Sequence, residues 1–154
     1  MMFREMRRKE KKLSQEDCQK LLYDGEFGIL STNTEIGYPY VVPLNYVYHN
    51  NSIYFHSATK GYKLDNIELN NKVSFCITSN VELLPSQFDT NYESVVVFGR
   101  AFEEIDNKKE ALKLLIEKYS SAFKKEGHEY IEKAHTATKV IRIDIDHITG
   151  KMQR

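Results

Sequence analysis

The segment HSATKGYK, residues 56–63, gathers the side chains of this chain that are best suited to bind an anion. It follows the apolar residues 53–55, which are typical of a buried strand. A phosphate needs several converging donors and is favoured by the N-terminus of a helix, which residues 61–70 can form. A solvated strand end with a helix cap would have the same composition, so both interpretations stay open. The residues that could contribute are His56, Ser57, Lys60, Gly61 and Lys63.

A second candidate segment is VPLNYVY, residues 42–48. A flavin ring needs a flat, mostly apolar slot with backbone groups and an amide at its polar edge. Pro43 cannot donate to a strand ladder, so it predicts an edge or a bulge where backbone groups are free. Asn45 could supply the amide, although an ordinary amide at a strand end is the alternative.

Other chemistries have no motif in this sequence. The five histidines and two cysteines show no HxH, HExxH or CxxC spacing, so we expect no metal site. Cys18 and Cys76 are expected to be buried free thiols in a reducing cytoplasm. GxSxG, P-loop and GxGxxG motifs are absent, which argues against a serine hydrolase and against the common nucleotide-binding loops.

Length and charge set the class of protein. The 154 residues predict a single domain over 1–154, with 1–12 as a partly flexible N-terminal arm that carries the basic run RRKEKK. The formal net charge is zero, which argues against a nucleic-acid binder. No run of 18 apolar residues occurs, so we expect a cytoplasmic protein without a membrane partner.

The hydrophobic patterns predict short strands joined by hairpins, with helices around them. Ser14 and Asp17 predict a helix start, Gly25 a left-handed helix end, and Gly99 a bulge. Residues 80–93 are expected to be a long irregular connection. Six or so strands in this order predict an antiparallel barrel or sandwich. The predicted strands are 27–32, 39–49, 52–58, 71–79, 94–105 and 139–150, the helices 14–24, 61–70 and 107–123, with a further short helix near 127–135 and a turn at 49–51.

Four segments together carry a family resemblance: GYPYVVPLNYVY, IYFHSATKGYKLDNIELNNKVSF, TNYESVVVFGRA and the closing HITGK. In this order and spacing they resemble the FMN-binding split-barrel family related to pyridoxamine 5′-phosphate oxidase, and most closely its nitroimidazole-resistance branch. The resemblance covers about residues 4–154. It implies a mainly β fold, a six-stranded antiparallel split β-barrel with peripheral helices, assembled as a homodimer.

The resemblance also implies where the cofactor would lie. FMN would be bound at the interface of the two subunits, with its phosphate held by the 56–63 segment. The residues implied are Val42, Pro43, Leu44 and Asn45 along the ring, His56, Ser57, Lys60, Gly61 and Lys63 at the phosphate, and Tyr92, Glu93 and Ser94 from the second subunit.

The implied activity is that of an FMN-dependent oxidoreductase with a small-molecule electron donor and acceptor, the acceptor being a nitro compound such as a 5-nitroimidazole. His56 near the flavin, or a tyrosine, is the candidate acid or base. The Arg-rich pattern with which true pyridoxamine 5′-phosphate oxidases hold their substrate is missing, so vitamin B6 is not the expected substrate. Two alternatives stay open: a flavin-binding or redox-sensing module without turnover, and a haem-binding split barrel with His147 as an axial ligand.

Overall fold

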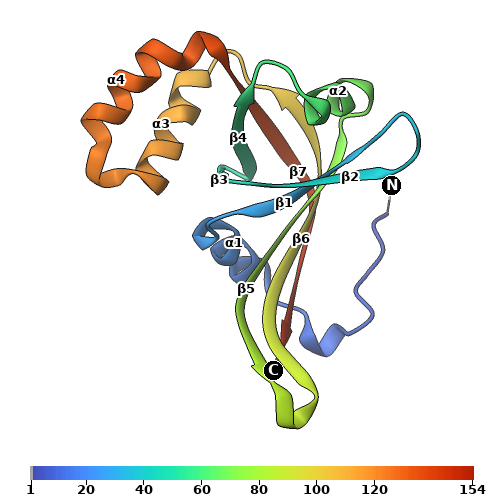
Figure 1. Cartoon of the computed structure of the whole chain (residues 1–154). Helices are drawn as coiled ribbons and strands as arrows, with labels where there is room; N and C mark the ends of the chain where they lie inside the picture. The colour runs from blue at the N-terminus through green and yellow to red at the C-terminus, as the bar shows by residue number, and fades with distance from the viewer. Residues whose placement is uncertain (1) are drawn as a thin grey trace.

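The computed structural model describes residues 2–154 and shows one seven-stranded antiparallel sheet in the order β2-β1-β5-β6-β7-β4-β3 (Figure 1). Helices lie outside the sheet, with α3 and α4 side by side at one side of it. The strands are β1 Gly28–Asn33, β2 Pro39–Leu44, β3 Val47–His49, β4 Ser52–Ala58, β5 Lys72–Leu84, β6 Asp89–Glu103 and β7 Thr138–Gln153. The helices are α1 Gln15–Asp24, α2 Tyr62–Leu69, α3 Lys108–Tyr119 and α4 Lys124–Ala134, and the 3-10 turns are η1 Lys9–Lys11, η2 Pro85–Gln87, η3 Ser121–Phe123 and η4 His135–Ala137.

The two edges of the sheet are strands that follow each other in the chain. Only Asn45 and Tyr46 connect β2 to β3, and such a link spans at most about 11 Å. The sheet must therefore curl until its edges are neighbours, although no ladder joins β2 to β3 within residues 2–154. The result is an antiparallel barrel that stays split along one seam.

The prediction of six strands is wrong because the expected strand 39–49 breaks at this seam. The backbone N–H of Tyr46 donates to the hydroxyl of Tyr119 at 3.0 Å, and its side chain is fully buried. The amide of Asn45 donates to the carbonyl of Glu26 at 3.0 Å. These bonds replace ladder bonds, so one long strand becomes two.

Two apolar clusters hold the fold together. The larger fills the inside of the curled sheet and includes Tyr46, Phe55 and Phe75, with Leu22 from α1. The smaller joins α3 and α4 to the outside of the sheet, and its buried members are Val47, Ala111, Leu112, Leu115, Ile131 and Val140. The α3–α4 pair is therefore held by its own core and not by the barrel interior.

Several predicted local features are confirmed. The Ser14 side chain accepts the backbone N–H of Asp17 at 3.1 Å and caps α1. Asn50 and Asn51 have φ of 48° and 58° in the turn from β3 to β4. The ladder between β6 and β7 shifts register at Gly99, where a Cβ would lie 2.5 Å from the carbonyl oxygen of Asp144.

Two local predictions are wrong. Gly25 is not left-handed, because its φ is −61°; a Cβ there would lie 2.4 Å from the hydroxyl of Tyr46, so close packing requires the glycine. Residues 80–93 are not an irregular connection. The β5–β6 ladder passes a bulge after Ser79 and continues to the pair Leu84 and Asp89, which makes a hairpin arm that extends beyond the barrel (Figure 1).

The N-terminal residues lie against the sheet. Lys12 forms a bridge with Lys151, and the ring of Phe3 stacks on that of His147 at 4.6 Å. None of the helices in residues 2–154 has both the length and the apolar composition needed to cross a membrane.

Candidate functional site

The end of β4 and the start of α2 form the first candidate site. Gly61 precedes α2 with φ of 159° and ψ of 164°, a conformation in which residues other than glycine are rarely found. No heavy atom lies within 4 Å of the place where its Cβ would be, and no side chain caps the helix. The N–H groups of the first turn of α2 therefore have no side-chain cap, which leaves them available to an anion.

His56 and Lys63 lie near each other at this site. Burial lowers the pKa of His56, and the charge of Lys63 lowers it further. The imidazole is therefore neutral at pH 7 and both donates and accepts hydrogen bonds. A bound anion would offset the charge of Lys63 and raise the pKa of His56 again.

Two residues predicted for the same site point elsewhere. Ser57 is buried on the barrel side of β4, and its hydroxyl donates to the carbonyl of Ala58 at 2.7 Å. Lys60 lines a different hollow, together with Glu103 and Lys139. The structure thus places His56 near Lys63. The Ser57 hydroxyl and Lys60 lie outside the space next to these two residues.

The β2 residues predicted to lie along the ring form the edge strand. Val42 and Leu44 pack against the barrel core, while Pro43 faces outward. The ring of Tyr40 on β2 lies 4.6 Å from that of Tyr62 in the first turn of α2. This contact brings the predicted ring segment next to the predicted phosphate segment.

Tyr92, Glu93 and Ser94 lie at the far end of the sheet from His56. Across β7, His56 faces Val140, whereas Ser94 faces Lys151. These two β7 residues are 11 positions apart, about 36 Å along a strand at about 3.3 Å per residue. In Figure 1 β7 runs from the α3–α4 side to the C-terminus beside the arm. Within one chain, no single flavin can contact both groups.

Local contacts hold two of the three residues at that end in place. The hydroxyl of Tyr92 accepts the ammonium of Lys151 at 3.0 Å. Glu93 is 9% exposed and forms an ion pair with Arg154. The base of the arm therefore presents ordered polar groups.

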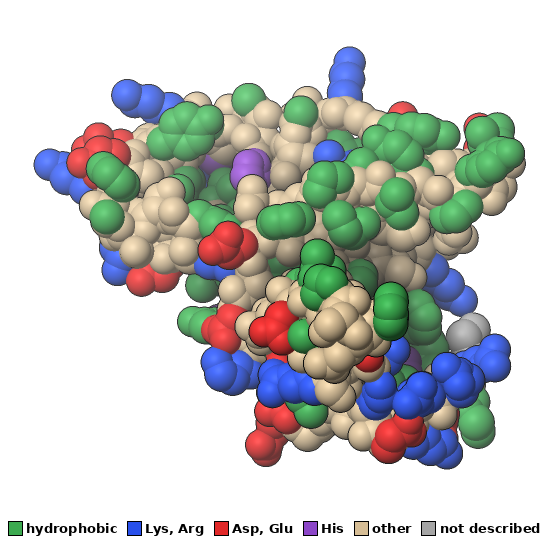
Figure 2. Space-filling model, turned by 60° about the horizontal axis from the view of Figure 1, so that its bottom comes forward, with side chains coloured by type: hydrophobic (Ala, Val, Ile, Leu, Met, Phe, Trp, Pro, Cys, Tyr) green, Lys and Arg blue, Asp and Glu red, His purple; other side chains and the backbone are tan. Residues whose placement is uncertain are grey.

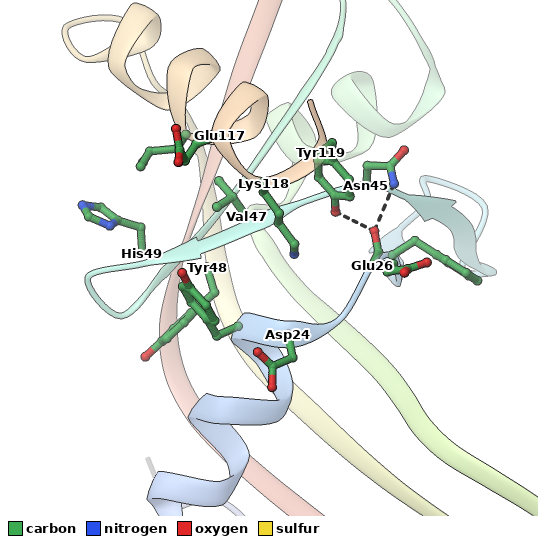
Figure 3. Close-up of a pocket in the computed structure, with 12 residues that line it drawn as sticks. Asp24, Glu26, Asn45, Val47, Tyr48, His49, Glu117, Lys118 and Tyr119 are labelled. Carbon is green, nitrogen blue, oxygen red and sulfur yellow. Dashed lines mark hydrogen bonds between the residues drawn. The ribbon is translucent and has the colours of Figure 1, made fainter. Parts of the chain in front are cut away.

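A second hollow was not predicted from the sequence. It measures about 810 Å³ and lies between the end of α1, β3 and the end of α3 (Figure 3). Figure 3 shows Lys118 pointing into it, with Asp24 below. The ammonium of Lys118 donates to the carbonyl of Tyr46 at 2.9 Å and lies 3.9 Å from the centre of the Tyr46 ring.

The chemistry of this hollow centres on the seam of the barrel. Burial lowers the pKa of Lys118 to about 8, although Asp24 and Glu26 oppose the shift. The Tyr119 hydroxyl accepts from Tyr46 N–H and donates to the carbonyl of Glu26 at 2.5 Å. These groups form hydrogen bonds with backbone atoms at the break between β2 and β3, so we assign them a structural role.

No group of three or more His, Cys, Asp or Glu side chains in residues 2–154 is placed to hold a metal ion. Cys18 is a buried free thiol as predicted, and Cys76 is free but only half-buried. The Nε2 atom of His147 is buried without a partner beneath Phe3, so it offers no open position for a haem.

A curled antiparallel sheet with one open seam and external helices defines the class of split β-barrels. Residues 14–152 match the sequence model of the pyridoxamine 5′-phosphate oxidase family. The chain belongs to this family, as the sequence resemblance predicted.

Solved structures from three bacteria share the fold. A candidate 5-nitroimidazole antibiotic resistance protein of Bacteroides thetaiotaomicron is 24% identical, with a TM-score of 0.79 over 92% of this chain and 86% of that one. An FAD-binding protein of Mesorhizobium loti is 26% identical, with a TM-score of 0.69 over 94% and 98% of the two chains. An FAD and heme binding protein of Mycobacterium smegmatis is 20% identical, with a TM-score of 0.80 over 94% and 74%. No curated protein matches the chain.

Proposed function

We propose that this protein binds FMN and acts as a flavin-dependent oxidoreductase. The observation that carries the proposal is the uncapped start of α2, open at Gly61, with Lys63 and His56 beside it. Family membership and the flavin-binding relatives from Mesorhizobium and Mycobacterium support it. The donor set fits a phosphate ester, which both FMN and FAD carry.

Different residues would hold the phosphate and the ring of the flavin. The ammonium of Lys63 and the free N–H groups of α2 would hold the phosphate. β2 pairs with β1 on one side only, so its other edge has free backbone groups for the polar edge of the ring. The neutral imidazole of His56 could hold or transfer a proton beside the ring.

We propose that the working unit is a homodimer. One chain separates His56 from Tyr92 to Ser94 by about 36 Å, so only a second copy can bring both groups to one flavin. The arm also needs cover, because a two-stranded hairpin is marginally stable in water. Its exposed apolar side chains are Val81, Leu83 and Phe88.

The outer face of the sheet supplies an apolar surface for such a partner. Pro43, Ile29, Cys76 and Val96 stand side by side across four strands. Ile29 is 38% exposed and Val96 37%. Figure 2 shows hydrophobic side chains on the arm and on the part of the molecule formed by β1 and β2. Contiguous apolar patches of this kind mark interaction surfaces.

FMN would supply hydride and electron transfer, and the protein would position and tune it. The acceptor we propose is a nitro compound such as a 5-nitroimidazole, which agrees with the description of the Bacteroides relative. A binding or sensing module without turnover is the competing function.

The first test is flavin binding by the purified protein. We expect FMN to stay with the protein through desalting, about one per chain. Lys63→Met should weaken FMN binding about 10- to 100-fold, because a charge-assisted hydrogen bond contributes about 1.5–3 kcal/mol. Lys113→Met, which removes an exposed lysine from α3, is the matched control and should bind normally. A colourless protein would refute the cofactor, and equal affinities would refute the phosphate site.

The second test separates enzyme from sensor. The holoprotein is reduced anaerobically with NADH or NADPH and then mixed with a 5-nitroimidazole. Bleaching followed by recovery of the flavin absorbance is the expected result. A flavin that neither donor reduces would favour the module without turnover.

A further inference from the structure

Lys118 presents a primary amine in the hollow of Figure 3, and the proposed flavin site does not use it. None of the ion pairs in residues 2–154 includes this lysine, and Asp24, which lies below it in the figure, pairs with Lys20 at 2.6 Å. The amine of Lys118 instead donates to the carbonyl of Tyr46 at 2.9 Å and lies 3.9 Å from the centre of the Tyr46 ring. It is therefore held in place without a carboxylate partner.

Part of this amine is neutral at physiological pH. Burial lowers the pKa of Lys118 from 10.5 to about 8. At pH 7 about 10% of Lys118 is therefore uncharged, against about 0.03% of a lysine with the ordinary pKa. The neutral amine is the nucleophile, and partly desolvated lysines are those that form imines with carbonyl compounds. The hydrogen bond to Tyr46 uses an N–H of the amine and leaves its lone pair free.

The hollow has room for a molecule that reacts with the amine. It measures about 810 Å³, within the range of about 300–1,000 Å³ that is usual for small-molecule sites. Tyr23, Phe27 and Tyr48 give it aromatic walls, and Tyr23 and Phe27 are exposed, so solutes reach it from the solvent. Glu26 and Glu117 add carboxylates to its lining. These walls suit an apolar body, and the carboxylates disfavour a negatively charged one.

The charge of the product distinguishes the reagents that a lysine amine attacks. An aldehyde gives a protonated imine, which keeps a positive charge over the Tyr46 ring and an N–H donor for the Tyr46 carbonyl. Carbon dioxide gives a carbamate anion, which Asp24, Glu26 and Glu117 would repel. Acylation gives a neutral amide and loses the cation over the ring. The contacts of Lys118 therefore favour an aldehyde.

We propose that Lys118 binds an uncharged aldehyde in this hollow as a protonated imine. The lone pair of the amine forms a bond to the carbonyl carbon, and the resulting carbinolamine takes up one proton and releases the former carbonyl oxygen as water. No electrons are transferred, so the step needs no flavin and does not rest on the proposed function. The imine keeps the hydrogen bond to Tyr46, so the structural role of Lys118 is preserved.

The test traps the imine in the full-length wild-type protein. Benzaldehyde is added at pH 7 with sodium cyanoborohydride, which reduces the imine to a stable secondary amine, and labelled lysines are identified by peptide mass spectrometry. We expect Lys118 to be labelled at least 10-fold faster than the exposed Lys113, and the preference to disappear when guanidinium chloride unfolds the chain. Equal labelling of the two lysines in the folded protein, or a preference that survives unfolding, would overturn the proposal.

A charged probe tests the class of aldehyde. 4-Carboxybenzaldehyde has the same ring and reactive group with an added negative charge, so its labelling of Lys118 relative to Lys113 should be at least 3-fold lower than that of benzaldehyde. Equal ratios for the two probes would overturn the assignment to uncharged aldehydes. A protein that binds no FMN but is labelled at Lys118 would refute only the proposed function, and a flavoprotein without preferential labelling would refute only this site.

Discussion

At the scale of single residues, His56 and Lys63 were predicted from the sequence to share a site, and the structure places them near each other. Both were predicted from one local segment, because a strand end and a helix start are set by neighbouring residues. The hollow around Lys118 and Tyr119 could not be predicted in this way. Their partners Tyr46 and Glu26 lie 72 and 93 positions away, so only the folded chain brings them together.

Removing the charge of Lys63 should raise the pKa of His56. Lys63 is the second cause of the low value after burial, so Lys63→Met should restore part of the shift. The measurement is an NMR titration of the imidazole. Lys60→Met is the control, since Lys60 lines another hollow, and an unchanged His56 titration in Lys63→Met would contradict the geometry.

Lys118 should make stability depend on pH under alkaline conditions. Its pKa falls from 10.5 to about 8 on folding, so between these values the unfolded chain binds more protons. The free energy of unfolding of the wild type, relative to Lys118→Met, should therefore rise from pH 8 to pH 10. Urea unfolding at several pH values measures it, with Lys113→Met as control. A difference that is constant or falls with pH would show that Lys118 is not held in this buried state.

At the scale of elements, the strands and helices with a buried face were predicted and the arm was not. The arm sequence NVELLPSQFDTNYE alternates only over residues 80–83, which is too short to indicate a half-buried strand, and neither face of the arm is covered by its own chain. Val81 is 60% exposed and Leu83 71%. The break between β2 and β3 escaped prediction for a different reason, since the bonds that cause it come from Glu26, between α1 and β1, and from Tyr119 at the end of α3.

The hydroxyl of Tyr119 should stabilise this break. Tyr119→Phe removes the partner of Tyr46 N–H and of the Glu26 carbonyl, and should lower the free energy of unfolding by about 1–3 kcal/mol. Tyr38→Phe, at a residue 73% exposed on the β1–β2 turn, should change it by less than about 0.5 kcal/mol. Urea unfolding compares the two, and equal stabilities would show that water replaces the hydroxyl.

At the scale of the whole molecule, the outer face of the sheet should decide assembly. Val96→Glu places a charge in the apolar row without disturbing the barrel interior, because Val96 faces outward. We expect it to convert dimers to monomers in sedimentation velocity and to lower flavin retention with them. Lys113→Glu on α3 should do neither. A dimer unaffected by Val96→Glu would place the partner elsewhere.

The position of β7 has a consequence for how the molecule forms. The last strand in sequence lies between β6 and β4, so it joins the β2-β1-β5-β6 half of the sheet to the β4-β3 half. Until residues 138–153 leave the ribosome, β4 has no ladder partner except the short β3. The nascent chain must hold two unpaired strand edges during synthesis, and pairing over such sequence distances is slow. We therefore expect the period before β7 docks to be the time at which this chain is most exposed to aggregation and to chaperones.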